Sequence, residues 1–353
     1  TGCFAATADR ASLPRADAWF ICVPTPLDGE GRPDLGPVRA ALETCRAGLR
    51  PGALVCLVST CQPGATNGLC RDVLERDGAL IGQDVYLAVS PEREDPGRAE
   101  SPRRVPRLLG APDAASLARA RGVWERLVDR VVPVATPEIA ECAKLLENAY
   151  RLVNIALMDE LHRGFAALGV PTRAVVAAAA TKPFGFAPFW PGAGAGGHCI
   201  PVDPGYLQME LARAGQPSAL VALAAAANAA RPRRVVDAVA AEFDGRLAGR
   251  RILVMGVTYK PGVADLRVAA PVAILSGLAA RGAVAMWHDP LPVEVEGFAR
   301  VEDPARCPDG PPEAVILGTP QPSFDLAALP RLAPVAFDPF GLLPRDAGRV
   351  VVV

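Results

Sequence analysis

Residues 54–60 read LVCLVST, an apolar run that ends in two hydroxyl residues and is followed by Pro63-Gly64. A short apolar run with a proline–glycine stop is typical of a buried strand that enters a loop. Two similar runs flank it, AWFICV at 18–23 and VYLAVSP at 85–91, and each also ends at a proline. Helical segments are predicted between these runs. Strands that alternate with short helices predict a parallel α/β sheet.

Polar residues follow all three predicted strands. Thr25 follows the first, Thr60 ends the second and Glu92 follows the third. The intervening segments 36–48 and 65–76 are the predicted helices. In a parallel sheet, ligands bind beyond the carboxyl ends of the strands. We therefore expect these three side chains to face one crevice.

A long helical segment, one helix or two in tandem, is predicted at 138–168. Apolar residues recur there at helical spacing, and no proline interrupts them. Glu141, Lys144, Asn148 and Arg151 step by three or four residues and so share one face. Taken alone, such a stripe is most often a solvated face. A second, Ala-rich helical region is predicted at 204–230.

A second α/β unit is predicted in the C-terminal part of the chain. Its strands are expected at 251–257, 283–290, 314–319 and 350–353, with a helix at 271–281.

Charge and composition exclude several classes of protein. The 353 residues include 37 Lys+Arg and 38 Asp+Glu, with half of the residues apolar. This balance argues against nucleic acid or an anionic membrane as a partner. The longest apolar stretches, such as 219–227, are shorter than the ~18 residues of a membrane span. The nine Cys form no CxxC pair and only three His are present, so we expect a reducing, cytoplasmic location and no metal site.

The densest chemical signal is residues 181–206, TKPFGFAPFWPGAGAGGHCIPVDPGY. Glycines allow the backbone of this loop to approach a ligand closely, and its N–H groups suit an anion or a sugar. Cys199 follows the glycines, and Asp203 lies four residues further on. Two interpretations of the cysteine are open, a nucleophile or an inert buried thiol. The glycines concerned are Gly192, Gly194, Gly196 and Gly197.

The segment GGHCIPVDP is similar to the active-site segment of the UDP-glucose/GDP-mannose dehydrogenase family. Six further segments resemble successive motifs of that family, in its order and at its spacing. They are FICVPTPLDGEGRPDL (20–35), STCQPGAT (59–66), SPEREDPG (90–97), ECAKLLENAYRLVNIALMDEL (141–161), TKPFGF (181–186) and GVTYKPGVADLR (256–267). The resemblance covers almost the whole chain.

The resemblance implies an NAD-dependent oxidoreductase that turns the C6 alcohol of a nucleotide-linked sugar into a carboxylate. The intermediate aldehyde donates a hydride only after a nucleophile has added to its carbonyl carbon. A thiolate supplies that nucleophile, which gives a thiohemiacetal and then a thioester that water hydrolyses. Cys199 is the expected nucleophile, and a homodimer is the expected assembly.

Further catalytic roles also follow from the resemblance. Lys144 and Asn148 are expected to bind substrate and to stabilise the oxyanions that form during the reaction. Asp203 is expected to orient water or Lys144 and to transfer protons. Thr60 and Glu92 are expected to position the hydrolytic water and to contact NAD.

Binding roles are expected in three places. The four glycines and Lys260 are expected to hold the UDP-sugar, Lys260 at the sugar or pyrophosphate. Thr25 and Arg267 are expected at NAD, Arg267 across a dimer interface, because a guanidinium suits phosphate recognition. His198 and His288 are expected to be packing residues.

The substrate class is expected to be a UDP-N-acetylhexosamine. SPER together with HCIPVDP resembles the branch that oxidises UDP-N-acetylglucosamine or UDP-N-acetylmannosamine for polysaccharide biosynthesis. The UDP-glucose branch usually carries NPE and Ser-Cys-Phe instead. The alternatives are UDP-glucose 6-dehydrogenase, a UDP-sugar-binding remnant without turnover, and a cysteine hydrolase, against which the lack of a His placed as the thiol's base counts.

The expected fold is α/β, with two Rossmann-like parallel-sheet domains joined by a long central helix and a helical middle domain. The expected domains are 1–130 for NAD, 131–235 for dimerisation and 236–353 for the UDP-sugar. The first is expected to be truncated, because no strand–GxGxxG–helix segment precedes the predicted strand at 18–23. Val268-Ala269-Ala270-Pro271 replaces the usual Glu-Ser-Pro after Arg267, and segment 314–324 lacks a frequent Asp-His pair.

Overall fold

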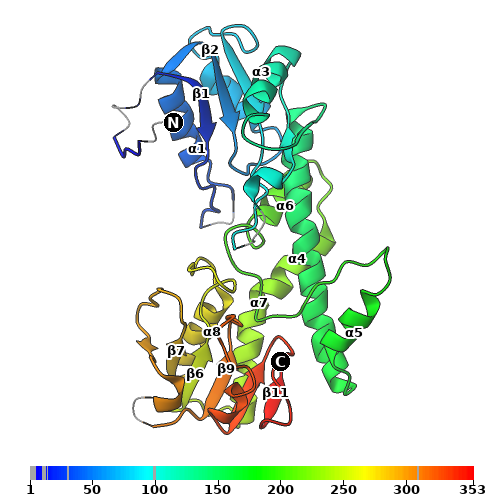
Figure 1. Ribbon diagram of the computed structural model, residues 1–353, viewed down its shortest axis with the longest axis vertical. Coiled ribbons are helices and arrows are strands. Elements are labelled where there is room, and N and C mark those ends of the chain that lie inside the picture. The colour runs from blue at the N-terminus through cyan, green and yellow to red at the C-terminus, as the bar shows by residue number, and fades with distance from the viewer. Residues whose placement is uncertain (1–4, 10–12, 14, 30–31, 98–100, 308–309) are drawn as a thin grey trace. The chain divides into compact units, whose positions relative to one another are not determined.

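The computed structural model describes residues 5–9, 13, 15–29, 32–97, 101–307 and 310–353 (Figure 1). The chain divides into two compact units. The first unit comprises Thr1–Asn148 and Val202–Pro217, and the second comprises Ala149–Pro201 and Ser218–Val353. The division into three domains at 130 and 235 stays a prediction.

The first unit contains the predicted parallel sheet, with strand order β1-β2-β3. Its strands are β1 (Ala16–Ile21), β2 (Leu49–Leu57) and β3 (Val85–Val89). A separate parallel pair is formed by β4 (Arg107–Leu109) and β5 (Val131–Pro133). The helical segments are α1 (Gly36–Ala47), a π-helical turn at Thr66–Cys70, α2 (Arg71–Leu74) and α3 (Ala114–Trp124).

Both faces of β3 and of the second half of β2 are buried, which explains why these segments read as continuous apolar runs. Along β2, Val55 and Leu57 pack in the core that contains α1 and α2, whereas Leu54 and Cys56 pack in the core that contains α3. This alternation is the two-residue period of a strand. The carboxyl ends of all three strands are thereby held at one edge.

The central helix is a single one, α4 (Pro137–Ala167), 31 residues long. The predicted Ala-rich region is instead two helices, α6 (Asp203–Arg213) and α7 (Ala219–Glu242). Gly215, with a φ of +73°, follows the end of α6 in a conformation that does not continue the helix. Ser218 then begins α7, because its side chain accepts a hydrogen bond from the amide of Val221. A short helix, α5 (Thr172–Ala179), follows α4.

The second unit contains a six-stranded parallel sheet of order β11-β10-β9-β6-β7-β8 (Figure 1). Numbered within the unit, this is the 3-2-1-4-5-6 order of doubly wound nucleotide-binding folds, read from the other edge. The chain reverses direction of winding between the neighbours β6 and β9, so the ligand crevice is expected there. The elements are β6 (Arg251–Met255), α8 (Ala270–Ala279), β7 (Val284–His288), β8 (Ala299–Arg300), β9 (Ala314–Leu317), β10 (Val335–Asp338) and β11 (Val350–Val352).

Two glycines bring the backbones together at this switch point. A Cβ on Gly256, which has a φ of +81°, would overlap the carbonyl oxygen of Thr319. A Cβ on Gly318 would likewise overlap the carbonyl oxygen of Gly256. Glycine is therefore required at both positions. The predicted α/β class with two Rossmann-like parallel sheets is confirmed.

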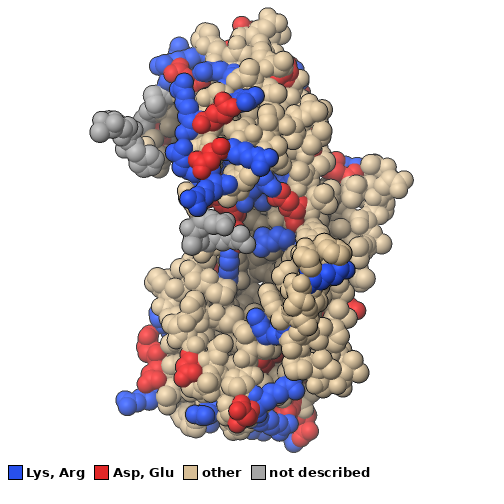
Figure 2. Space-filling view, turned by 45° about the vertical axis from the view of Figure 1, so that its right-hand side comes forward, with Lys and Arg blue, Asp and Glu red and all other residues tan. Residues whose placement is uncertain are grey.

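The surface carries charges of both signs. Basic and acidic side chains are interspersed on the face shown in Figure 2, in keeping with the near-zero net charge. Within the described ranges, no helix combines the length and the apolar character needed to cross a membrane.

Candidate active site

The loops that follow β1 and β2 are fastened to each other by hydroxyl groups. The Thr25 hydroxyl donates to the carbonyl of Thr60 at 2.8 Å, and the Ser59 hydroxyl donates to the carbonyl of Val23 at 2.6 Å. Parallel pairing of β1 with β2 sets these loops side by side. The structure thus brings together Thr25 and Thr60 at the carboxyl ends of the strands, as the sequence predicts.

Glu92 follows β3 and is anchored on both carboxylate oxygens. Its Oε2 atom accepts a hydrogen bond from the Arg107 guanidinium at 2.7 Å. Its Oε1 atom accepts hydrogen bonds from the backbone amides of Arg93 (2.7 Å) and Glu94 (2.9 Å). Burial raises the pKa of Glu92, but the Arg107 hydrogen bond and charge and the two amides outweigh it and lower the pKa. Glu92 is therefore a fixed anion with a side chain that is still 45% exposed.

Arg107 is the buried partner that holds this anion. Its side chain is 4% exposed, donates to the carbonyl of Ser90 at 2.9 Å and stacks 4.5 Å above the ring of Trp124. This partner was not predictable from the sequence pattern, because Arg107 lies 15 residues from Glu92 and resembles the many surface arginines.

Glu141 of α4 is buried, so the solvated-face interpretation of its stripe is wrong at this position. It is 2% exposed and accepts from the amides of Gly64 (2.6 Å) and Thr66 (3.0 Å) and from the Thr66 hydroxyl (2.6 Å). The carboxylate thus caps the helical segment that follows β2. Glu141 thereby occupies the amide donors of Gly64 and Thr66 at that helix start.

Lys144, Asn148 and Asp203 form a buried polar cluster in the first unit. Asn148 Nδ2 donates to Asp203 Oδ2 at 2.6 Å, and Lys144 interacts electrostatically with the same carboxylate. The three residues are 7%, 2% and 4% exposed. Burial raises the pKa of Asp203 to about 6, although the Lys144 charge and the Asn148 hydrogen bond oppose this rise. A carboxylate of this kind can exchange a proton near neutral pH.

Tyr206 is a residue of this region that the sequence analysis did not single out. It lies one turn after Asp203 on α6, is fully buried, and donates to the carbonyl of Thr25 at 2.8 Å. The start of α6 is therefore tied to the strand-end loop of the same unit. Its position three residues after Asp203, and so on the same helix face, is the sequence feature from which it could have been predicted.

Glu147, a further charged residue of α4, has its partner on another segment of the first unit. It pairs with Arg93 at 2.6 Å rather than with Arg151, which lies one turn later on the same helix. The physical reason is that Arg93, on the loop after β3, reaches Glu147 with two guanidinium nitrogens.

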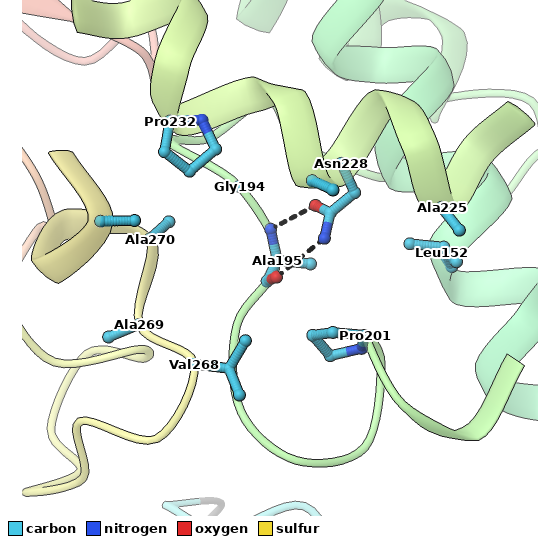
Figure 3. Close-up of a pocket in the computed structure, with 12 residues that line it drawn as sticks. Leu152, Gly194, Ala195, Pro201, Ala225, Asn228, Pro232, Val268, Ala269 and Ala270 are labelled. Carbon is cyan, nitrogen blue, oxygen red and sulfur yellow. Dashed lines mark hydrogen bonds between the residues drawn. The ribbon is translucent and has the colours of Figure 1, made fainter. Parts of the chain in front are cut away.

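The glycine loop belongs to the second unit and is held at two points. Gly192 donates its amide to Asp159 at 2.8 Å and accepts from Arg231 at 2.9 Å. Ala195 donates its amide to Asn228 at 2.7 Å and accepts from the same side chain at 3.0 Å, as Figure 3 shows. The loop therefore has a defined backbone shape.

A pocket of about 250 Å³ lies beside the glycine loop (Figure 3). Its walls are mostly apolar, and Asn228 already uses its amide on Ala195. The lining residues are Leu152, Gly194, Ala195, Pro201, Ala225, Asn228, Ala229, Pro232, Val268, Ala269, Ala270 and Ala273.

The second pair of glycines packs against the loop that follows β6. A Cβ on Gly196 would lie 2.6 Å from the carbonyl oxygen of Val268, and one on Gly197 would lie 3.0 Å from the Tyr259 ring. The amide of Gly197 donates to the carbonyl of Arg267 at 3.0 Å. Close backbone approach thus requires glycine at both positions, and the loop that carries Cys199 is attached to the segment that carries Arg267.

Arg267 is paired within its own segment. Its guanidinium contacts the Asp265 carboxylate at 2.6 Å and 2.9 Å, while 61% of its side chain stays exposed. Lys260 lies on the same loop, immediately beyond the switch point of the second sheet. The predicted packing role of His288 agrees with its 2.7 Å hydrogen bond to the carbonyl of Val301.

Gln321 organises the switch-point loop and was missed at the sequence level. Its Nε2 donates to the Thr258 hydroxyl at 2.8 Å and to the Asp289 carboxylate at 3.0 Å. Its Oε1 accepts the amide of Gly262 at 2.9 Å. Gln321 lies in the segment where the expected Asp-His pair is lacking, so a different polar residue fixes the loop here.

Two segments of the chain match models of one protein family. Residues 1–128 match the model of the UDP-glucose/GDP-mannose dehydrogenase family, NAD binding domain, and residues 138–230 match the central domain of that family. The chain belongs to the UDP-glucose/GDP-mannose dehydrogenase family. The first match also confirms the prediction of an NAD-binding domain.

Related proteins are similar along most of this chain. It is 34% identical to the UDP-N-acetyl-D-glucosamine 6-dehydrogenase of Pseudomonas aeruginosa over 77% of this chain and 66% of that protein. It is 34% identical to Protein CapL of Staphylococcus aureus over 74% of this chain and 62% of that protein. The chain thus spans less than two thirds of the length of these two relatives.

A solved structure supports the same relationship. The UDP-D-ManNAc dehydrogenase from Pyrococcus horikoshii superposes with a TM-score of 0.86 at 25% identity, over 98% of this chain and 83% of that one.

The first unit fits NAD at the ends of its strands. Thr25, Thr60 and the fixed anion Glu92 lie at the carboxyl ends of β1, β2 and β3, where a doubly wound sheet binds a dinucleotide. A glycine-rich strand-to-helix turn for the diphosphate is not among the described residues of this unit.

Proposed function

We propose that this chain is an NAD-dependent UDP-sugar 6-dehydrogenase, an oxidoreductase that converts the C6 alcohol of a UDP-N-acetylhexosamine into a carboxylate. UDP-N-acetylglucosamine and UDP-N-acetylmannosamine are the proposed substrates. The names of related proteins, a UDP-N-acetyl-D-glucosamine 6-dehydrogenase and a UDP-N-acetyl-D-mannosamine dehydrogenase, support this substrate class.

One observation carries the proposal, the buried carboxylate of Asp203 held by Asn148 beside the charge of Lys144. A buried acid with a pKa of about 6 is suited to activating water at neutral pH. Cys199 lies four residues before Asp203, so the chain itself keeps their Cα atoms within about 14 Å. That thiol is the proposed nucleophile.

In the proposed reaction the Cys199 thiolate adds to the C6 aldehyde and forms a thiohemiacetal. The ammonium of Lys144 and the second N–H of the Asn148 amide stabilise the oxyanion. Loss of hydride leaves a thioester, and Asp203 takes a proton from the water that hydrolyses it. NAD, when bound, accepts one hydride in each of the two oxidation steps. Thr60 and Glu92 are proposed to position that water and, with Thr25, to contact NAD.

The nucleotide part of the substrate is proposed to lie at the switch point of the second sheet. Lys260 is proposed to contact the pyrophosphate, and the loop that contains Gly192, Gly194, Gly196 and Gly197 the sugar. Arg267 is proposed to reach NAD of a second subunit, and its exposed guanidinium supports this role.

A homodimer in the cytoplasm is the proposed state of the protein. Exposed apolar side chains of α4 and α7 in the second unit are the proposed contact surface, because large apolar surface favours association. They are Tyr150, Leu157, Leu161, Leu220 and Leu223. The buried thiols of Cys45, Cys56, Cys61 and Cys70 form no disulfide, which supports a reducing compartment.

The test combines turnover with binding. The purified chain is incubated with NAD and, separately, with UDP-N-acetylglucosamine, UDP-N-acetylmannosamine and UDP-glucose, and NADH and acidic product are quantified. Two NADH for each uronate are expected with an N-acetylhexosamine. Preference for UDP-glucose would favour the UDP-glucose 6-dehydrogenase alternative, whereas thermal stabilisation by UDP-sugar without NADH would favour a binding protein without turnover.

A further inference from the structure

One residue of the glycine loop, Gly192, is held through both of its peptide groups by a buried ion pair. Asp159 of α4 accepts the amide of Gly192 at 2.8 Å, and Arg231 of α7 donates to the carbonyl of Gly192 at 2.9 Å. The Arg231 Nε and Asp159 Oδ2 atoms are 3.9 Å apart. Their side chains are 1% and 5% exposed, so water does not compete for these bonds.

A second attachment lies three residues further along the loop. Asn228, one turn before Arg231 on α7, binds the amide and the carbonyl of Ala195. Ala193, between the two attachments, is 2% exposed and packs in the core of the second unit. Four consecutive residues of the loop are thus fixed before any ligand is present.

The ion pair does more for orientation than for stability. Buried charges are desolvated, and well-packed apolar residues often stabilise a fold as well or better. An apolar pair, however, cannot define which way a peptide group points. Arg231 also donates to the carbonyl of Val353 at 2.5 Å, so the same guanidinium joins the loop to the end of β11.

We infer that Arg231 and Asp159 are positioning residues, which set the backbone of residues 192–197 so that it receives the UDP-sugar. The inference rests on the proposed function, which places the sugar at this loop. Asn228 has the same role at Ala195. A loop fixed in advance loses little conformational entropy on binding, so the affinity for the sugar nucleotide depends on these side chains.

The experiment compares Arg231→Met, Arg231→Lys and Asn228→Asp with a matched control, Arg233→Met. Arg233 lies on the same helix, is 82% exposed and, within the part of the chain that the structure describes, forms an ion pair with Asp237 alone, at 3.7 Å. Amide hydrogen exchange of peptides covering 190–199 is measured without ligand. The dissociation constants of UDP-N-acetylglucosamine and NAD are measured by calorimetry.

Arg231→Met is expected to speed exchange in 190–199 and to weaken UDP-N-acetylglucosamine binding about tenfold or more, while NAD affinity changes less than about twofold. Arg231→Lys, which keeps one donor, is expected to be intermediate, and Arg233→Met to match the parent. If Arg231→Met does not fold, Asn228→Asp, which replaces the donor to the Ala195 carbonyl with a carboxylate oxygen, decides whether the polar attachments to α7 set the loop.

Two results would overturn the inference. Unchanged exchange in 190–199 would mean that the side chains do not fix the loop. Faster exchange with unchanged sugar-nucleotide affinity would mean that the loop shape does not matter for binding. Failure of the parent chain to bind UDP-N-acetylglucosamine would instead overturn the proposed function, and the exchange comparison would still decide whether Arg231 sets the loop.

Discussion

The Asn148 amide donates a 2.6 Å hydrogen bond to the Asp203 carboxylate, across 55 residues of sequence. The bond joins α4 to the first residue of α6, and Lys144 adds its charge from one turn earlier on α4. The predicted helix face and the predicted acid therefore meet, and they do so in a place that water scarcely reaches.

Asp203 makes folding stability depend on pH in a defined direction. Burial raises its pKa from 3.8 to about 6, so the native protein keeps a proton that the unfolded chain releases in that interval. The free energy of unfolding should therefore fall as pH rises from about 4 to about 6, and Asp203→Asn should remove about 3 kcal/mol of this fall. Urea unfolding of parent and variant at pH 4 and pH 7 measures the effect.

Asp159 also contributes to the pH dependence of stability, because burial raises its pKa to about 6 as well. Its contribution is therefore measured separately. Asp159→Asn is the matched control and should remove a separate part of the pH dependence. Equal pH slopes in the parent and in Asp203→Asn would contradict the assignment.

Cys199→Ser should abolish formation of the uronate while leaving UDP-sugar binding intact. A serine hydroxyl of ordinary pKa is a far weaker nucleophile than a thiolate, so a loss of about 100-fold or more is expected. The variant is made in a parent protein that shows measurable uronate formation, and the product is quantified by mass spectrometry. Cys142→Ser, at an exposed cysteine of α4, is the control. Oxidation to acid at the parental rate would exclude Cys199 as the nucleophile.

Glu141→Ala should destabilise the first unit by about 2–4 kcal/mol, because it leaves the buried donors of Thr66 without a partner. Chemical denaturation measures the change. Glu138→Ala, one turn earlier, removes a carboxylate that accepts one side-chain hydrogen bond from Asn67 and should cost about 1 kcal/mol. Similar losses for the two variants would show that Glu141 does not act as the cap.

Gln321→Leu should weaken UDP binding about tenfold, because the loop 256–262 loses the hydrogen bonds of Gln321 to the Thr258 hydroxyl and to the Gly262 amide. The dissociation constant of UDP, measured by calorimetry, reports the change. Gln216→Leu, at an exposed position of the first unit, serves as control. Full affinity in Gln321→Leu would place the nucleotide away from the switch point.

The fold was predictable from the sequence wherever a strand is buried on both faces, because such a strand has a continuous apolar sequence, as in β2 and β6. The strand β10 was missed, since the short segment 335–338 is followed by Pro339 and reads as a turn. The helix α3 was missed because its Ala- and Arg-rich sequence shows little apolar periodicity. Local pattern carries no information on contacts that only the tertiary fold creates.

The candidate site likewise contains residues that were predictable from the sequence and residues that were not. Lys144, Asn148 and Asp203 were identified from residue type and resemblance, and the structure brings these three together in one unit. Cys199 lies in the other unit, so its meeting with them stays a prediction. The partners Arg107, Tyr206 and Gln321 were not foreseen, because each acts on a residue 15 or more positions away.

The paired glycines at 256 and 318 constrain how this fold can change. Since the two main chains touch where β6 and β9 end, neither position tolerates even a methyl group. New substrate preferences in such a protein must therefore arise in the surrounding loops, while the floor of the proposed nucleotide crevice stays invariant through evolution or redesign.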